Sequence, residues 1–83
     1  MKFKAEVHVM PKKEILDPQG KAVMLGLQNL GIQNINDVRV GRHIDLEVEA
    51  ANREEAESKV EQACKKLLAN VIMETYSYSI SEN

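Results

Sequence analysis

Apolar and polar residues alternate strictly over residues 3–9, and this period of two is typical of a strand with one buried face. Two shorter alternating runs follow at residues 38–40 and 44–48, with Gly41 between them. We expect these runs to form a hairpin that turns near Gly41. The turn type stays open, because a single glycine is a weaker signal than Asn-Gly or Asp-Gly. Residues 71–80 predict one more strand at the end of the chain.

A first helix is predicted between the first two of these strands. Asp17 suits the N-cap and Pro18 the first helical position, where its missing N–H costs nothing. Gly31 suits the left-handed residue after the helix end. We expect Gly26, in mid-helix, to allow close packing against the sheet. The predicted buried stripe comprises Ala22, Val23, Gly26, Leu27 and Leu30.

A second helix is predicted from a capping-box pattern, with Asn52 as the cap and Glu55 three residues later. Asn70 is expected to cap its end. Acidic residues crowd the first turns and lysines the last, which complements the helix macrodipole. The predicted buried stripe comprises Ala56, Val60, Ala63, Cys64 and Leu67.

The resulting order is strand, helix, strand, strand, helix, strand within a single domain of residues 1–83. This order predicts an α+β fold of the ferredoxin-like split βαβ type, with a four-stranded antiparallel sheet and both helices on one face. The other sheet face is expected to be polar, as antiparallel sheets tolerate. It would carry Lys4, Glu6, His8, Arg39, Asp45 and Glu47.

The amino-acid composition and the net charge exclude several classes of function. Apolar residues make up 43% and charged residues 29% of the chain, which is ordinary for a globular domain. No apolar run approaches the ~20 residues of a membrane span, and no signal peptide is evident, so we expect a cytoplasmic protein with no membrane partner. A net charge of −2 disfavours nucleic-acid binding. Residues 1–43 carry seven Lys or Arg against four Asp or Glu, whereas residues 44–83 carry four against nine.

Residues able to carry catalysis are few. His8 and His43 are the only histidines, and neither has a second His or Cys at metal-ligand spacing, so we expect surface histidines and no metal site. The single cysteine, Cys64, falls in a predicted buried stripe, where a thiol acts as a small hydrophobe. No phosphate-binding loop or dinucleotide motif occurs. We therefore expect no catalytic residue and no cofactor in this chain.

Several residues suggest contact surfaces instead. Apolar side chains fall on both faces of the predicted strand at residues 71–80, which is typical of a strand that meets another chain. A bulge that swaps the faces is the alternative. Gly20, near the third helical position, fits either a tight structural contact or an accessible helix start, and both interpretations stay open. The self-association candidates are Leu25, Tyr76, Tyr78 and Ile80.

The segment Leu-Asp-Pro-Gln-Gly-Lys-Ala-Val at residues 16–23, followed by Asp-Val-Arg-Val-Gly-Arg at residues 37–42, resembles the PurS family. Its members are the small subunits of phosphoribosylformylglycinamidine synthase, from purine biosynthesis. Residues 66–70, with Glu74 and the tyrosines that follow it, are similar to the C-terminal pattern of that family. One departure is Arg42, where lysine is common.

This resemblance implies a non-catalytic subunit. The complex converts formylglycinamide ribonucleotide, glutamine and ATP into formylglycinamidine ribonucleotide. The family's chains form homodimers or homotetramers and join a glutaminase subunit to a large synthetase subunit, supporting ammonia transfer between them. ATP and Mg are implied for the synthetase subunit alone. The implied partner contacts are Leu16, Asp17, Pro18, Gln19, Gly20, Arg39, Gly41 and Arg42.

Two other functions remain possible for such a fold. One is a small dimeric regulatory domain that binds an amino acid or nucleotide between its subunits. The other is an acylphosphatase-like enzyme. The second is disfavoured because residues 10–14, after the first strand, lack a loop that could cradle a phosphate.

Overall fold

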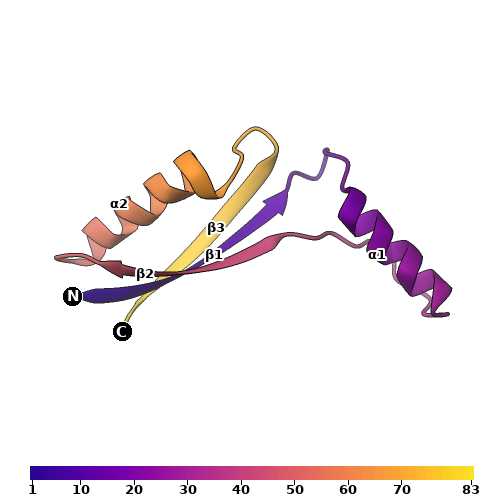
Figure 1. Cartoon of the computed structure of the whole chain (residues 1–83), viewed down its shortest axis with the longest axis horizontal. Helices are drawn as coiled ribbons and strands as arrows, with labels where there is room; N and C mark the ends of the chain where they lie inside the picture. The colour runs from indigo at the N-terminus through magenta and orange to yellow at the C-terminus, as the bar shows by residue number, and fades with distance from the viewer.

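The computed structural model describes residues 1–83 and is organised around a three-stranded antiparallel sheet (Figure 1). The strands are β1 (Lys2–Pro11), β2 (Arg42–Glu49) and β3 (Glu74–Glu82), in the order β2-β1-β3. Both outer strands pair antiparallel with β1 along almost its whole length. The outer strands therefore run parallel to each other, and the chain between them crosses over β1.

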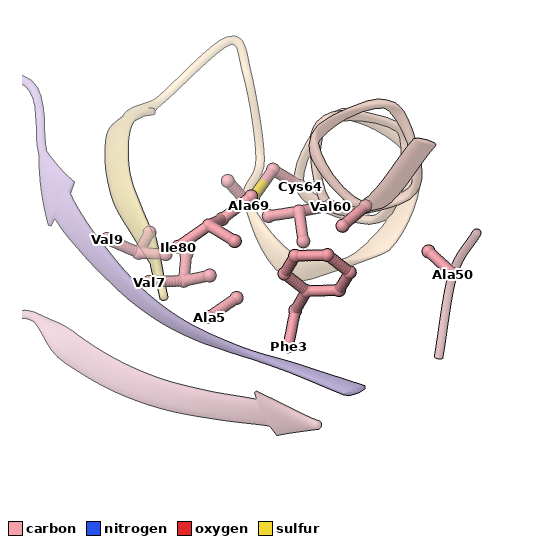
Figure 2. Packing of buried hydrophobic residues seen from close by; sticks show 10 residues of the cluster. Phe3, Ala5, Val7, Val9, Ala50, Val60, Cys64, Ala69 and Ile80 are labelled. Atoms are coloured by element: carbon pink, nitrogen blue, oxygen red, sulfur yellow. The ribbon is translucent and has the colours of Figure 1, made fainter. Parts of the chain in front are cut away.

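That crossover is the helix α2 (Arg53–Ala63), which continues as a π-helical turn, η1 (Cys64–Leu68). In Figure 2 the side chains of β1 point towards this helix, as the alternation of residues 3–9 predicts. The sheet and α2 enclose a core of ten buried residues, and the opposite sheet face is open to solvent. The core comprises Phe3, Ala5, Val7, Val9, Ala50, Ala56, Val60, Cys64, Ala69 and Ile80.

The predicted fourth strand and its hairpin at Gly41 are absent. Residues 33–41 form a linker without strand pairing, and β2 begins only at Arg42. The local pattern at residues 38–40 favours extended backbone, but a strand also needs a neighbour with free hydrogen-bonding groups. Both edges of β1 are already occupied by β2 and β3. The four-stranded prediction is therefore wrong for the single chain.

The first helix, α1 (Pro18–Asn29), has the predicted ends but not the predicted packing. Asp17 is the N-cap and Gly31 has a φ of +78°. Figure 1 shows α1 beyond the end of the sheet, away from α2. Its expected buried stripe is largely exposed: Leu30 is 77% exposed, and nothing lies within 4 Å of a Cβ built on Gly26. The prediction of both helices on one sheet face is therefore wrong.

This placement makes the chain elongated. Its extents are 51 × 27 × 15 Å and its radius of gyration is 16.4 Å. A compact globule of this length would have a radius of gyration of about 12 Å. The linker carries α1 outward because α2 alone covers the apolar face of the sheet. No helix has the length and apolar character needed to cross a membrane.

The second predicted helix is confirmed at its start and corrected at its end. The Asn52 side chain accepts a hydrogen bond from Glu55 N at 2.8 Å, as the capping box requires. Leu67, expected in the buried stripe, is 82% exposed. The reason is the π-helical turn, which inserts one extra residue and presents Leu68 to the core in its place. Asn70 does not cap the helix; its side chain accepts from Ile72 N in the following turn.

The last strand begins later than predicted. Residues 71–73 form a turn, so β3 starts at Glu74. Tyr76, Tyr78 and Ile80 lie on the strand face that packs towards the core. The expectation of apolar side chains on both faces of one strand is therefore wrong, because the earlier apolar residues precede the strand.

Candidate partner-contact site

A hollow of about 600 Å³ lies where the end of β1, the start of α1, the end of the linker and the turn before β3 meet. We call it the motif hollow, because the two sequence segments singled out above converge there. The predicted contact residues that line it are Leu16, Asp17, Pro18, Gln19, Gly41 and Arg42. Residues 17 and 42 are distant in sequence, and only the folded chain brings them together.

Asp17 ties the helix start to the linker. Its Oδ1 accepts a hydrogen bond from Gly20 N, and its Oδ2 accepts one from Val40 N, both at 2.9 Å. These two backbone N–H groups hold the pKa of the Asp17 carboxyl below its usual range. The carboxylate therefore serves as a clamp between α1 and the linker in addition to its capping role.

Gly20 does not line the motif hollow; it is the buried residue of α1. A Cβ at this position would collide with the backbone oxygen of Val38 and lie 2.7 Å from Oδ2 of Asp17. Of the two interpretations left open by the sequence, the tight structural contact is the one this geometry supports. Gly20 allows the linker to pass close to the first turn of α1.

Arg39 does not lie on the polar sheet face, as expected, but in the linker. Its guanidinium donates to the backbone oxygen of Pro11, at the end of β1. It faces a neighbouring hollow of about 560 Å³ that shares Leu16 and Asp17 with the first. A Cβ at Gly41 would collide with Met10 and the backbone of Val9, so a glycine is needed where the linker runs beside the end of β1.

Arg42 and Glu74 close the opposite wall. The Arg42 guanidinium donates to both carboxylate oxygens of Glu74, at 2.8 and 3.0 Å, and to the backbone oxygen of Leu68 at 2.7 Å. Oε1 of Glu74 also accepts from Asn70 N at 2.8 Å. The bond from Arg42 lowers the pKa of Glu74, and the same bond raises the pKa of Arg42. This wall joins the starts of β2 and β3.

Sequence reasoning missed the role of the turn before β3. Asn70, Met73 and Glu74 line the motif hollow, although they were given no place in it. Glu74 belongs to the segment that resembles the PurS family, which was the one available signal. Its pairing with Arg42 depends on strand register, which the sequence does not show.

The charged groups of the motif hollow are already engaged within the chain. Both oxygens of Asp17 and both oxygens of Glu74 accept internal hydrogen bonds. Apolar side chains stand free at the rim, with Leu16 65% exposed. One fixed ion pair and one carboxylate bonded to backbone N–H groups, beside an exposed apolar side chain, suit a protein contact better than acid–base chemistry, which requires a group free to exchange protons.

The self-association candidates separate into two groups. Leu25 lies on the uncovered helix α1, and its side chain is 58% exposed. Tyr76 and Tyr78 are half-buried against the core, and the Tyr76 hydroxyl donates to Oε2 of Glu61 at 2.9 Å. Burial and the Glu61 carboxylate raise the pKa of Tyr76 to about 12. Ile80 is only 7% exposed, so it is a core residue of its own chain and offers almost no surface to another.

Comparison with known proteins places these features in a family. Residues 4–82 match the family model PurS, described as phosphoribosylformylglycinamidine (FGAM) synthase. The chain is 38% identical over 80 residues to the phosphoribosylformylglycinamidine synthase subunit PurS of Bacillus subtilis, covering 96% of this chain and 94% of that one. It is 39% identical over 74 residues to the same subunit of Mycobacterium leprae, covering 89% and 90%.

Solved structures agree with the sequence comparison. The B. subtilis PurS structure superposes with a TM-score of 0.87 at 38% identity, covering 96% of this chain and 99% of that chain. A structure of PurLQS from Thermotoga maritima superposes with a TM-score of 0.89 at 32% identity, covering 98% and 99%. Identity of this extent over nearly the whole chain, together with the shared fold, shows that this chain belongs to the PurS family of phosphoribosylformylglycinamidine synthase subunits.

Proposed function

We propose that this chain is the non-catalytic small subunit of a phosphoribosylformylglycinamidine synthase and that it joins the glutaminase subunit to the large synthetase subunit. The observation that carries this proposal is the exposure of α1, whose first turn lines one side of the motif hollow. A helix that exposes leucines and packs on no part of its own sheet is a contact surface. Family membership favours this function over a stand-alone regulatory or acylphosphatase-like domain.

The chemistry of the complex belongs to the partners in this proposal. The glutaminase releases ammonia, and the synthetase uses ATP and Mg to activate the amide of formylglycinamide ribonucleotide. This chain positions the two subunits so that ammonia passes between them. The T. maritima structure named PurLQS supports the proposal, since it places a chain of this fold in one structure with PurL and PurQ.

The shape of the chain also supports self-association as a homodimer or homotetramer. The linker segment at residues 38–40 is unpaired, and β2 and β3 each leave one edge free. We propose that the linker of one copy adds to an edge strand of another copy and that α1 covers apolar surface there. This exchange would supply the fourth strand that the sequence predicts.

Reconstitution tests the bridging function. The glutaminase and synthetase subunits of the same organism are assayed with and without this chain, using glutamine or ammonium as the nitrogen source. We expect glutamine-dependent turnover to require this chain and ammonium-dependent turnover to be largely independent of it. Equal activity with and without the chain, from both nitrogen sources, would contradict the proposal.

A pair of variants tests the motif hollow in the same assay. Leu16→Ser removes the exposed apolar side chain at its rim, whereas Leu67→Ser makes the same change at an exposed position on η1. Each is expected to change the free energy of unfolding by less than about 0.5 kcal/mol. We expect only Leu16→Ser to weaken assembly. If both variants assemble equally well, the motif hollow is not part of the contact with the partner subunits.

A further inference from the structure

Most basic side chains form ion pairs within the chain, and the exceptions gather at one place. Of the eleven lysines and arginines, six lie 2.8–4.0 Å from a carboxylate oxygen. The five that form no such pair are Lys12, Lys13, Lys21, Arg39 and Lys66. The first four of these surround the hollow of about 560 Å³ that adjoins the motif hollow, whereas Lys66 lies on η1.

We call Lys12, Lys13, Lys21 and Arg39 the hinge cations, because they lie where α1 and the linker leave the sheet. Three of them line the hollow of about 560 Å³, and Lys12 joins Lys13 and Arg39 around an adjoining hollow of about 400 Å³. They come from the end of β1, the start of α1 and the linker, so that only folding brings them together.

The local structure does not explain these charges. Lys21 is the fourth residue of α1, at the helix end where the macrodipole disfavours a cation. Lys12 and Lys13 are adjacent in sequence and repel each other. Arg39 donates to the backbone oxygen of Pro11, which fixes its guanidinium but leaves most of its five N–H donors for another acceptor. The hinge cations are therefore available to a group outside the chain.

The carboxylates of the same hollow do not neutralise the hinge cations. Asp17 is already held by the backbone N–H groups of Gly20 and Val40. Glu14 and Asp37 line the hollow without forming an ion pair. Four cations thus stand beside two free carboxylates, in a chain whose net charge is −2. The excess of positive charge is confined to this part of the surface.

The surroundings of the hinge cations suit a protein surface better than a small anion. None of the four side chains is buried, as an enclosed anion site would require. Leu16, which is 65% exposed, lines this hollow as well as the motif hollow. An apolar side chain with charged side chains around it is the usual composition of a protein interface, and charges at the rim accelerate association with an oppositely charged partner.

We propose that the hinge cations dock against a carboxylate-rich surface of a partner subunit of the synthase. This inference rests on the proposed bridging function and adds the charge of the surface that the chain meets. Arg39, already fixed by Pro11, presents a planar fork that suits carboxylates, whereas the three flexible lysines attract them at longer range.

The chain concentration that gives half-maximal glutamine-dependent turnover, with both partner subunits present, tests this proposal. We expect a Lys13→Gln and Lys21→Gln double variant to need about tenfold more chain in about 0.05 M NaCl and to reach the same maximal turnover. In about 0.5 M NaCl the difference from the unaltered chain should largely disappear, because salt screens exposed charges. Circular dichroism verifies that the variant is folded.

Lys66→Gln is the matched control, since it removes an unpaired cation that lies outside the hinge. It should need the same chain concentration as the unaltered protein. An equal loss in Lys66→Gln, or a double variant that behaves like the unaltered chain, would overturn the proposal. If the unaltered chain itself does not raise turnover at any concentration, the bridging function fails instead.

Cross-linking of the assembled complex with a carbodiimide identifies the docked surface, because this reagent joins a lysine amine directly to a carboxylate in contact with it. We expect Lys13 and Lys21 to be linked to Asp or Glu residues of the glutaminase or of the synthetase, and the linked subunit is the partner. Cross-links from these lysines only to a second copy of the chain, or none at all, would overturn the proposal.

Discussion

Gly20 and Gly26 occupy the same helix in opposite environments. Gly20 is enclosed by the linker and by the capping carboxylate, so that no side chain fits there. Gly26 faces open space, and its helical backbone needs no glycine. The first glycine is therefore required by packing, whereas nothing in the single chain explains the second.

We expect alanine to have opposite effects at these two positions. Gly20→Ala should destabilise α1 by about 1–3 kcal/mol, because the added methyl displaces the linker and outweighs the better helix propensity. Gly26→Ala should stabilise α1 by about 0.5–1 kcal/mol, through helix propensity alone. Hydrogen exchange of the α1 amides, measured at low protein concentration, distinguishes them. Equal exchange rates in the two variants would contradict the close contact at Gly20.

At the scale of elements, the π-helical turn decides which leucine stabilises the core. A backbone hydrogen bond from Ala69 N to the oxygen of Cys64, at 3.0 Å, closes the wide turn. Leu68 consequently packs against the core, while its neighbour Leu67 projects into solvent. A regular α-helix would reverse these positions.

Two truncations test the π-helical turn. Leu67→Ala should change the free energy of unfolding by less than about 0.5 kcal/mol, as expected for an exposed site. Leu68→Ala should cost more, about 1–2 kcal/mol, since it removes part of a half-buried side chain. Urea unfolding of the monomer measures both values. A larger loss for Leu67→Ala would show that the helix is regular.

The sequence predicted correctly the features that depend on neighbouring residues, and it failed for features that depend on residues far away along the chain. Asp17 and Asn52 were identified as caps because capping depends on atoms three residues away. The strand at residues 38–40 was predicted wrongly because pairing depends on a distant neighbour. Arg42 was placed among the contact residues by resemblance alone, and its partner Glu74, 32 residues away, was not predicted. The π-helical turn at Cys64–Leu68 was not predicted either, because a helical pattern of period 3.6 does not reveal one inserted residue.

At the scale of the whole molecule, the separation of α1 from the core leaves apolar surface without cover. Ten side chains, of which Phe3 is the only aromatic one, form the entire core, and α1 adds none of its leucines to them. Leu25 and Leu30 instead contact solvent in the single chain. Burying such side chains between copies would stabilise an assembly by roughly 1.5–3 kcal/mol each.

We expect Leu25→Glu to weaken self-association at least tenfold, because a buried carboxylate without a partner is costly. Leu67→Glu makes the same change at an exposed site on η1 and should leave the association constant nearly unchanged. Sedimentation equilibrium over a range of concentrations measures both constants. If Leu25→Glu associates as strongly as the unaltered chain, that face of α1 lies outside the contact.

The buried thiol of Cys64 gives the chain an internal reporter. It is the only cysteine, it is the first residue of η1 and fully buried in the core, and burial raises its pKa. A thiol reagent can therefore modify it only during transient opening of the core. When the core opens and closes faster than the reagent reacts, the labelling rate follows the fraction of chains that are open, and its decrease with rising subunit concentration would report how strongly assembly holds each copy closed.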